Sequence, residues 1–259
     1  MIEPKELAQG YTLVNDTQYN AGLFLLDKLG DITGLKVLDV GCGTGNLTTY
    51  IARLVGEDGS VVGIDPSKER ITIASAQARS NSSFSEGRAE DLSPYASASF
   101  DVVFVNSTFH WVADQPRAMR EFARVLKSGG RLGISGGSGD FVAIHEKIKE
   151  DVLSREPYHD YPEESGPTFL KKKEIVDLLD DAGFSDREIV VNTIIKSAKD
   201  GEAMVDWLDT SSSGKTYGGI PLSMRPKAKE EMLREWEKFT SADGIRMDME
   251  LLVTVAIKD

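Results

Sequence analysis

The sequence contains little cysteine and little histidine, with one Cys, at position 42, and three His among 259 residues. A single cysteine excludes an internal disulfide and any metal site built from several cysteines. No stretch approaches the 18 or so consecutive apolar residues that a membrane-spanning helix needs. The first residues, Met1–Glu6, are too polar for a signal peptide, so we expect a protein of the reducing cytoplasm.

Positive charge is also scarce, because 30 Lys and Arg stand against 42 Asp and Glu and leave a formal net charge of −12. The longest basic run is Lys171–Lys173. Nucleic acids and anionic membranes are bound by clustered Lys and Arg, so we expect neither as a partner. A chain with this charge does not attract an anionic ligand from a distance, and such a ligand would need local hydrogen-bond donors.

Residues 35–136 alternate short β-branched runs with helical stretches, which is the pattern of a doubly wound α/β sheet. The apolar runs are nearly continuous, as in strands that are covered on both faces. We expect strands at Lys36–Val40, Ser60–Ile64, Ser83–Ser85, Asp101–Val105 and Arg131–Ile134. We expect helices at Leu47–Leu54, Lys68–Arg79 and Gln115–Leu126. The pattern predicts a mostly parallel sheet with helices on both faces.

The pattern is looser in the second half, where residues 141–170 read as a helix followed by a loop rich in proline, tyrosine and glutamate. The later elements that we expect are a helix at Lys172–Ala182, a strand at Glu188–Ile195, helices within 201–240 and a strand at Leu251–Ile257. We therefore expect a main domain, 1–200 plus 246–259, and a helical lid insertion, 201–245, at the carboxyl edge of the sheet.

A glycine-rich loop, Asp39–Gly45, joins the first expected strand to its helix with the sequence Asp-Val-Gly-Cys-Gly-Thr-Gly. Glycines two residues apart let the backbone approach a ligand closely. A dinucleotide-binding loop would have its third glycine at the position of Asn46, and a phosphate-binding Walker loop needs a lysine that is missing here. The loop therefore favours a nucleoside ligand without a pyrophosphate.

An acidic residue, Asp65, ends the second expected strand in the sequence Gly-Ile-Asp-Pro. A carboxylate at this position can accept hydrogen bonds from both hydroxyls of a ribose. The alternative is that Asp65 only caps the next helix, a task that Ser67 could perform equally well.

These motifs resemble those of the class I S-adenosylmethionine-dependent methyltransferases. The residues that carry the resemblance are Val37–Gly45, Val62–Asp65, Asp101–Val105 and Leu126–Leu132. The resemblance implies a Rossmann-like fold with a seven-stranded, mostly parallel sheet and a reversed last strand at Leu251–Ile257. It also implies S-adenosylmethionine as the cofactor and S-adenosylhomocysteine as its product.

The same resemblance assigns residues to the cofactor. Asp39 and the loop glycines would line the methionine part, Asp65 would hold the ribose, and Asn106 would lie beside the sulfonium. The adenine-binding stretch matches Gly87–Leu92, although Arg88 stands where an aspartate is usual. The full expected set is Tyr11, Asp39, Gly41, Cys42, Gly43, Gly45, Asn46, Asp65, Pro66, Ala89, Glu90 and Asn106.

An aromatic cluster, Phe109, His110 and Trp111, follows the fourth expected strand, where the edge of a doubly wound sheet opens into a crevice. Such a cluster can form the wall of a pocket, and an indole N–H can donate to an oxyanion. The alternative is that the rings only pack under the next helix. His110 is a candidate base.

A finer resemblance involves Thr108–Val112 together with Asp16–Asn20, which are similar to segments of the juvenile hormone acid methyltransferase-like group. The trans-aconitate methyltransferases are more distant relatives of that group. The resemblance implies that Gln18 and Trp111 hold the carboxylate of the substrate.

We therefore expect O-methylation of a small carboxylic acid, without a metal. A carboxylate is ionised at pH 7, so this reaction requires no general base. The alternatives are N-, C- or S-methylation of another small metabolite, a nicotinamide-dependent oxidoreductase, which Asn46 opposes, and a non-catalytic protein that keeps the fold. Arsenite methylation is disfavoured, because that activity needs several cysteines and only Cys42 is present.

Overall fold

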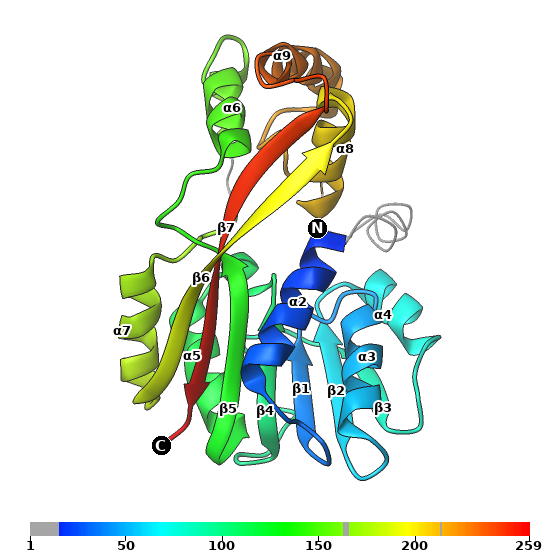
Figure 1. Ribbon diagram of the computed structural model, residues 1–259, viewed down its shortest axis with the longest axis vertical. Helices are drawn as coiled ribbons and strands as arrows, with labels where there is room; N and C mark the ends of the chain where they lie inside the picture. Colours follow the sequence, from blue (N-terminus) through cyan, green and yellow to red (C-terminus); the bar gives the residue numbers. More distant parts are fainter. Residues whose placement is uncertain (1–15, 163–165, 213) are drawn as a thin grey trace.

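The centre of the molecule is a twisted β-sheet (Figure 1); the computed structural model describes residues 16–162, 166–212 and 214–259. The strands are β1 (Lys36–Val40), β2 (Ser60–Asp65), β3 (Ser82–Glu86), β4 (Phe100–Asn106), β5 (Leu126–Gly137), β6 (Asp186–Ala198) and β7 (Ile245–Ile257). Within the described residues the sheet has seven strands in the order β3-β2-β1-β4-β5-β7-β6. β7 is antiparallel to both of its neighbours, and the other pairs are parallel. The fold predicted from the sequence is confirmed.

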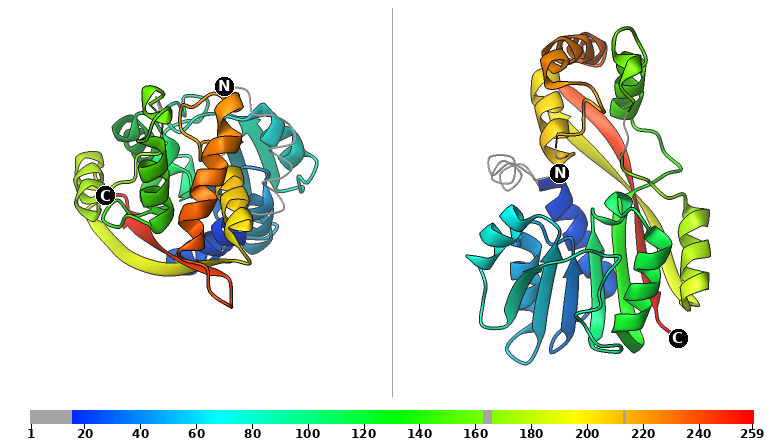
Figure 2. Two further views of the ribbon diagram at one scale, coloured as in Figure 1. Left: turned by 90° about the horizontal axis from the view of Figure 1, so that it is seen from above. Right: turned by 180° about the vertical axis from the view of Figure 1, so that it is seen from behind.

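Helices cover both faces of the sheet (Figure 2). They are α2 (Asp16–Leu29), α3 (Asn46–Val55), α4 (Lys68–Ser75), α5 (Gln115–Val125) and α7 (Lys172–Ala182). Leu25 of α2 and Ile51 of α3 are fully buried in the core of one face. Phe122 of α5 and Leu179 of α7 are fully buried in the core of the other. The central strands are buried between these two cores, which explains why their sequences read as nearly continuous apolar runs.

Several elements differ in length from the sequence prediction. The helix expected to reach Arg79 ends at Ser75, because the N–H groups of Gln77 and Ala78 donate to carbonyls three residues earlier and turn the chain out of the helix. The expected strand Arg131–Ile134 is the centre of β5, which begins at Leu126.

The last two strands are much longer than expected, because they pair with each other beyond the rest of the sheet. Their pairing runs without interruption from Asp186 opposite Ile257 to Ala198 opposite Ile245. The charged residues Arg246 and Asp248 interrupt the apolar run of β7 and hide its first half from a reading of the sequence.

A second helical body lies beyond the carboxyl ends of the parallel strands, at the far end of this two-stranded ribbon (Figures 1 and 2). We call it the cap; it comprises α6 (Ile144–Leu153), α8 (Gly201–Ser211), α9 (Arg225–Glu237) and residues 214–224. Its apolar core includes Val152, Met204 and Trp236, together with Met247 of β7. The insertion expected at 201–245 is thus only part of this body, because α6 packs in the same core.

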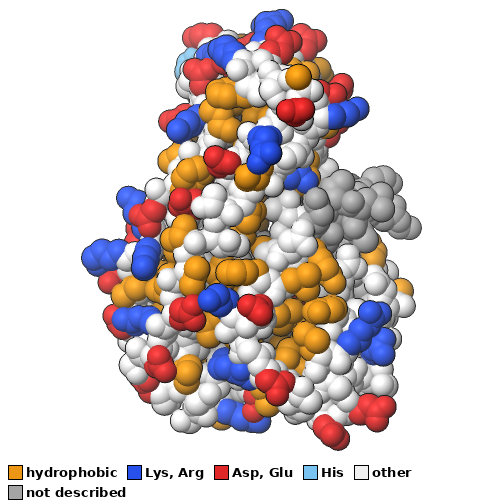
Figure 3. Space-filling view, in the orientation of Figure 1, with side chains coloured by type: hydrophobic (Ala, Val, Ile, Leu, Met, Phe, Trp, Pro, Cys, Tyr) orange, Lys and Arg blue, Asp and Glu red, His pale blue; other side chains and the backbone are white. Residues whose placement is uncertain are grey.

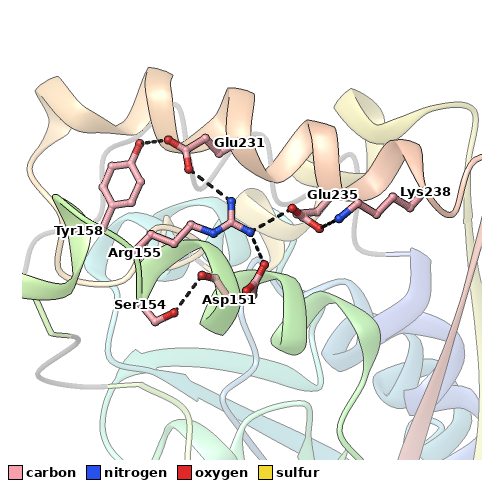
Figure 4. A network of polar contacts seen from close by, with 7 residues as sticks. All are labelled: Asp151, Ser154, Arg155, Tyr158, Glu231, Glu235 and Lys238. Atoms are coloured by element: carbon pink, nitrogen blue, oxygen red, sulfur yellow. Dashed lines mark hydrogen bonds and ion pairs between the residues drawn. The ribbon is translucent and has the colours of Figure 1, made fainter.

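A network of charged side chains joins α6 to α9 (Figure 4). Arg155 forms ion pairs with Asp151, with Glu231 at 3.5 Å and with Glu235 at 3.0 Å. Tyr158 donates a hydrogen bond to the other carboxylate oxygen of Glu231 at 2.9 Å. One guanidinium therefore ties two helices that are far apart in the sequence.

The surface in the view of Figure 1 carries scattered charges of both signs, and hydrophobic side chains gather around α2 (Figure 3). Among the described residues, no helix combines the length and the apolar character that crossing a bilayer requires.

We expect the cap to lose stability independently of the sheet when Trp236 is replaced by alanine. Trp236 is 1% exposed and is the largest fully buried side chain of the cap core, so Trp236→Ala should cost about 3–5 kcal/mol locally. Hydrogen exchange followed by mass spectrometry should show faster exchange in α6, α8 and α9 but not in β1 or α3. Phe239→Ala is the control, because this ring is 46% exposed. Equal loss of protection in β1 would show that the cap and the sheet unfold as one unit.

Candidate active site

The glycine-rich loop runs from the end of β1 to the start of α3, and two of its glycines are required by geometry. Gly41 has a φ of 78°, and a Cβ there would lie 2.1 Å from Oγ1 of Thr108. Gly45 has a φ of 86° and is the N-cap residue of α3. Both positions need a residue without a side chain, since L-residues with a Cβ rarely adopt a positive φ.

Hydrogen bonds hold this loop against the end of β2. The N–H groups of Gly41 and Cys42 donate to the carbonyl of Ile64 at 2.7 and 2.9 Å. The N–H of Gly43 donates to Oδ2 of Asp65 at 3.0 Å, and Oδ1 of Asp65 accepts from the N–H of Ser67 at 2.9 Å. Asp65 is buried, so in this structure its carboxylate fixes the loop and the first turn of α4.

Asp39 is the second buried carboxylate of the site. Its Oδ2 accepts a hydrogen bond from Oγ1 of Thr48 at 2.6 Å. Burial raises the pKa of Asp39 to about 7, against the lowering effect of the Thr48 hydrogen bond. Burial also raises the pKa of the Cys42 thiol, with contributions from Asp39 and Asp65, so Cys42 stays protonated and is no nucleophile.

A pocket opens between this loop, α2 and the end of β4. Its volume is about 400 Å³, including the part that is open to solvent. It is lined by Gln18, Tyr19, Asp39, Gly41, Cys42, Gly43, Thr44, Asn46, Leu47 and Asn106. Gln18 Oε1, Thr44 Oγ1 and Asn106 Oδ1 are buried and have no hydrogen-bond partner in the described part of the chain. Buried polar atoms without partners are costly unless a ligand or water satisfies them.

The segment after β4 connects the pocket to the aromatic cluster. Asn106 Nδ2 donates to the backbone carbonyl of Gln18 at 2.9 Å, which ties β4 to α2. Ser107 has a φ of 52°, an uncommon value for a residue other than glycine and one that often marks a functional segment. Thr108 Oγ1 donates to the carbonyls of Asn106 at 3.0 Å and Gly41 at 3.4 Å. Thr108 thereby joins the glycine loop to the cluster.

His110 and Trp111 lie in the short 3-10 helix η1 (Phe109–Trp111) and face different surroundings. The ring of His110 packs between Trp111 and Phe169, and burial lowers its pKa to about 4, so His110 is a weak base. The indole of Trp111 is 36% exposed, and Nζ of Lys215 lies 5.1 Å from its ring centroid. Lys215 belongs to the cap, so this contact joins the cap to the sheet.

The other expected site residues lie outside the set that lines the pocket. Ala89 is buried, and Glu90 accepts a hydrogen bond from the N–H of Ala113 at 3.1 Å and pairs with Arg88 at 3.6 Å. Pro66 is exposed. Gly45 and Asp65 belong to or contact the glycine loop but do not line the pocket. His110 and Trp111 lie past the end of β4 and do not line it either. Tyr11 lies outside the described residues.

Sequence reasoning missed several residues that the structure brings to the site. Tyr19, Thr44 and Leu47 line the pocket, although each is next to a residue that was predicted. Thr48 and Thr108 act through hydrogen bonds to Asp39 and Gly41, respectively. The sequence gives no indication of these bonds, because threonine is common in helices and turns.

Comparison with known proteins agrees with this geometry. Residues 38–134 match the model of the methyltransferase domain family. The chain is 39% identical over 111 residues to a demethylmenaquinone methyltransferase of Lactococcus lactis, covering 41% of this chain and 44% of that protein. It is 34% identical over 160 residues to an arsenite methyltransferase of Aquipseudomonas alcaligenes, covering 57% and 44%. The match thus spans less than half the length of each of these curated relatives.

Among solved structures, the YcgJ protein of Bacillus subtilis superposes with a TM-score of 0.64 at 19% identity, covering 93% of this chain and 98% of that one. This likeness shows the fold. The sequence match is to a methyltransferase domain and extends over residues 38–134, from β1 into β5.

Proposed function

We propose that this protein transfers a methyl group from S-adenosylmethionine to a small molecule and that the acceptor atom is a carboxylate oxygen. The observation that carries the first part is the pocket beside the glycine loop. Its backbone is bare at Gly41 and Gly43, and the side-chain oxygens of Gln18, Thr44 and Asn106 are buried there without partners in the described chain.

The pocket fits the methionine end of the cofactor. An ammonium group is a donor, and the unpartnered oxygens of Gln18 and Asn106 are acceptors. When ionised, Asp39 adds a negative charge to the pocket lining, which favours a cationic ligand. When bound, S-adenosylmethionine supplies an electrophilic methyl group on a positively charged sulfur. The chain's own task is then to hold this group beside Asn106 and to keep water out.

The acceptor side supports a nucleophile that is already ionised. The histidine that follows β4, His110, is half-buried, and desolvation of its ring lowers its pKa to about 4, so it is poorly suited to remove a proton at pH 7. A carboxylate needs no such step. Trp111 offers a partly exposed indole and Gln18 a half-buried amide, and these are the two donors that we propose for the carboxylate. In-line displacement then depends on alignment and on exclusion of water.

Relatives favour a second candidate, which is transfer to carbon. A C-methyltransferase of ubiquinone and menaquinone biosynthesis from Vibrio parahaemolyticus is 33% identical over 137 residues, which cover 49% of this chain. Arsenite methylation, the activity named for another relative, is disfavoured because the single cysteine, Cys42, is buried in the glycine loop.

A labelled-methyl transfer assay over carboxylic acids, phenols, amines, thiols and quinone precursors tests the proposal directly. We expect methyl esters as products, identified by mass spectrometry, and S-adenosylhomocysteine that binds the free protein in calorimetry. Binding of NAD without any response to S-adenosylhomocysteine would contradict the methyltransferase assignment. Product methylated only on carbon would support the methyltransferase assignment and exclude a carboxylate as the methyl acceptor.

Gln18→Ala should raise the KM for an accepted acid about tenfold, because a hydrogen bond to a charged group contributes about 1.5–3 kcal/mol. Steady-state kinetics with saturating S-adenosylmethionine measure this change. Asn20→Ala is the matched control, since Asn20 is exposed on the same helix. A KM unchanged by Gln18→Ala would show that Gln18 does not bind the acceptor.

The raised pKa of Asp39 predicts a pH dependence of cofactor binding. Below pH 7 the buried carboxyl holds a proton, and above it the carboxylate is charged and attracts a cationic ligand. Affinity for S-adenosylmethionine should therefore increase from pH 5.5 to pH 7.5, whereas stability of the ligand-free protein should fall over the same range, since the folded state holds the proton more tightly. Calorimetry and thermal unfolding measure both trends, and Asp39→Asn should flatten both. Identical pH profiles for the variant and the natural protein would contradict this role.

A further inference from the structure

We propose that the outer edge of β6 pairs with the same strand of a second copy of this chain, so that two sheets join in a dimer. β6 is the last strand of the sheet, and among the described residues it pairs only with β7. In the view from above it curves along the outside of the molecule (Figure 2). Within the described chain, its N–H and C=O groups on the side away from β7 therefore form an open edge.

The two edges of the sheet differ in length and in chemistry. β3, at the opposite edge, has 5 residues with the mostly polar sequence Ser-Ser-Phe-Ser-Glu. β6 has 13 residues, and residues 189–195 at its centre contain no charge, no proline and no glycine. Its register with β7 runs without a shift, so no bulge bends the edge away. Natural edge strands avoid pairing by being short, charged, bulged or interrupted by proline, and the centre of β6 has none of these features.

Apolar side chains are exposed along this edge. Val191 is 47% exposed and Ile195 is 50% exposed, and with the exposed Thr193 they alternate along one face of the strand. On the other face, Val190 and Ile194 are half-buried. An apolar strand left open to solvent in this way is a template for pairing with another chain, and a neighbouring strand would cover side chains on both faces.

The order of side chains along β6 fits a second copy that runs in the opposite direction. When Asn192 lies opposite its own copy, the register gives pairs of β-branched residues, which are Ile189 with Ile195, Val190 with Ile194 and Val191 with Thr193. Two-fold symmetry forms each pair twice. Because β-branched pairs across antiparallel strands are stabilising, the strand is complementary to itself, and this identifies a second copy as the occupant of the edge.

The charges at the ends of β6 fit the same register. Glu188 lies near the start of the strand and Lys196 near its end, on the same face. Antiparallel pairing about Asn192 brings Glu188 opposite Lys196 of the second copy, and opposite charges across two strands attract. This contact would add to those within one copy, where Glu188 binds Lys28 at 2.9 Å and Lys196 lies 4.7 Å from the ring centroid of Trp207.

Sedimentation velocity of the full chain over a range of concentrations tests whether it dimerises and gives the Kd. We expect a species of twice the mass of the chain. Its Kd should fall as salt is added, because each copy carries a net charge of −12 and salt screens their repulsion.

Ile195→Lys should weaken the dimer at least about tenfold, because it replaces an apolar pair with Ile189 at two symmetric places. Leu222→Lys is the matched control, since it makes the same kind of change at a side chain of the cap that is 77% exposed, and it should leave the Kd unchanged. The melting temperature of either variant, measured at a concentration where the protein is monomeric, should change little, because both side chains are exposed in the monomer.

A cysteine at the centre of the strand tests the register. Asn192→Cys should form a disulfide-linked dimer on mild oxidation, because residues that face each other in an antiparallel pair are about 4.5–5.5 Å apart between Cα atoms, within reach of a disulfide. Ser197→Cys is the control, because this exposed position would lie about 30 Å from its own copy. The natural Cys42 is buried and so does not interfere.

A chain that stays monomeric at every concentration and salt level overturns the proposal. A dimer that Ile195→Lys does not weaken would have its interface elsewhere and overturns it as well. Asn192→Cys that cross-links no better than Ser197→Cys also overturns it, because the pairing about Asn192 would then be absent. Weakening by Ile195→Lys together with selective cross-linking at position 192 supports the proposal.

Discussion

The hydrogen bond from the N–H of Gly43 to the buried carboxylate of Asp65 is the interaction on which the pocket depends. It fastens the loop after β1 to the end of β2, beside the bonds that Ile64 accepts from Gly41 and Cys42. The same carboxylate accepts from Ser67 at the N-cap of α4. One buried anion thus positions the loop and a helix start. Because a carboxylate offers about four acceptor sites, this role is compatible with the proposed contact to a ribose.

The position of the cap is determined by the reversed strand β7. β6 and β7 are antiparallel, so their connection can extend from one end of the ribbon, and the ribbon continues past the parallel strands to carry α8 and α9 beyond their carboxyl ends. α6 comes from a different connection, the one between β5 and α7, and packs in the same core. The cap is therefore built from two separate segments, which the hydrogen bond from Lys149 to the carbonyl of Lys215 connects.

The sequence predicted what depends on short spacing. The glycine loop and Asp65 each follow from residues within a few positions of one another, and the structure has the predicted fold, whose reversed last strand the family resemblance implied. The length of β7 could not be predicted, because the exposed Arg246 and Asp248 alternate with the buried Ile245 and Met247 and make this stretch resemble a loop. Membership of α6 in the cap could not be predicted either, since an apolar helix face does not indicate which element it packs against.

The residues of the candidate site also divide into those that short sequence motifs predict and those that tertiary packing brings together. Asp39 and Asn106 were found from motifs, and both line the pocket. Lys215 belongs to no motif, and only the fold brings it to Trp111 from a distant part of the chain. Residues of the pocket beside the glycine loop can be read from the sequence because most of them lie in loops at one edge of the sheet. Acceptor residues come from several elements whose meeting is decided by tertiary packing.

Two carboxyl groups, Asp39 and Asp65, lie buried at the glycine loop. A cationic methyl donor bound there would meet negative charge, and the proposed acceptor carries a charge opposite to that of the donor. Their reaction neutralises both charges, so the surrounding protein gains by excluding water, which would otherwise stabilise the separated ions. A net negative chain can therefore serve the proposed anionic acceptor, provided that local hydrogen-bond donors hold it.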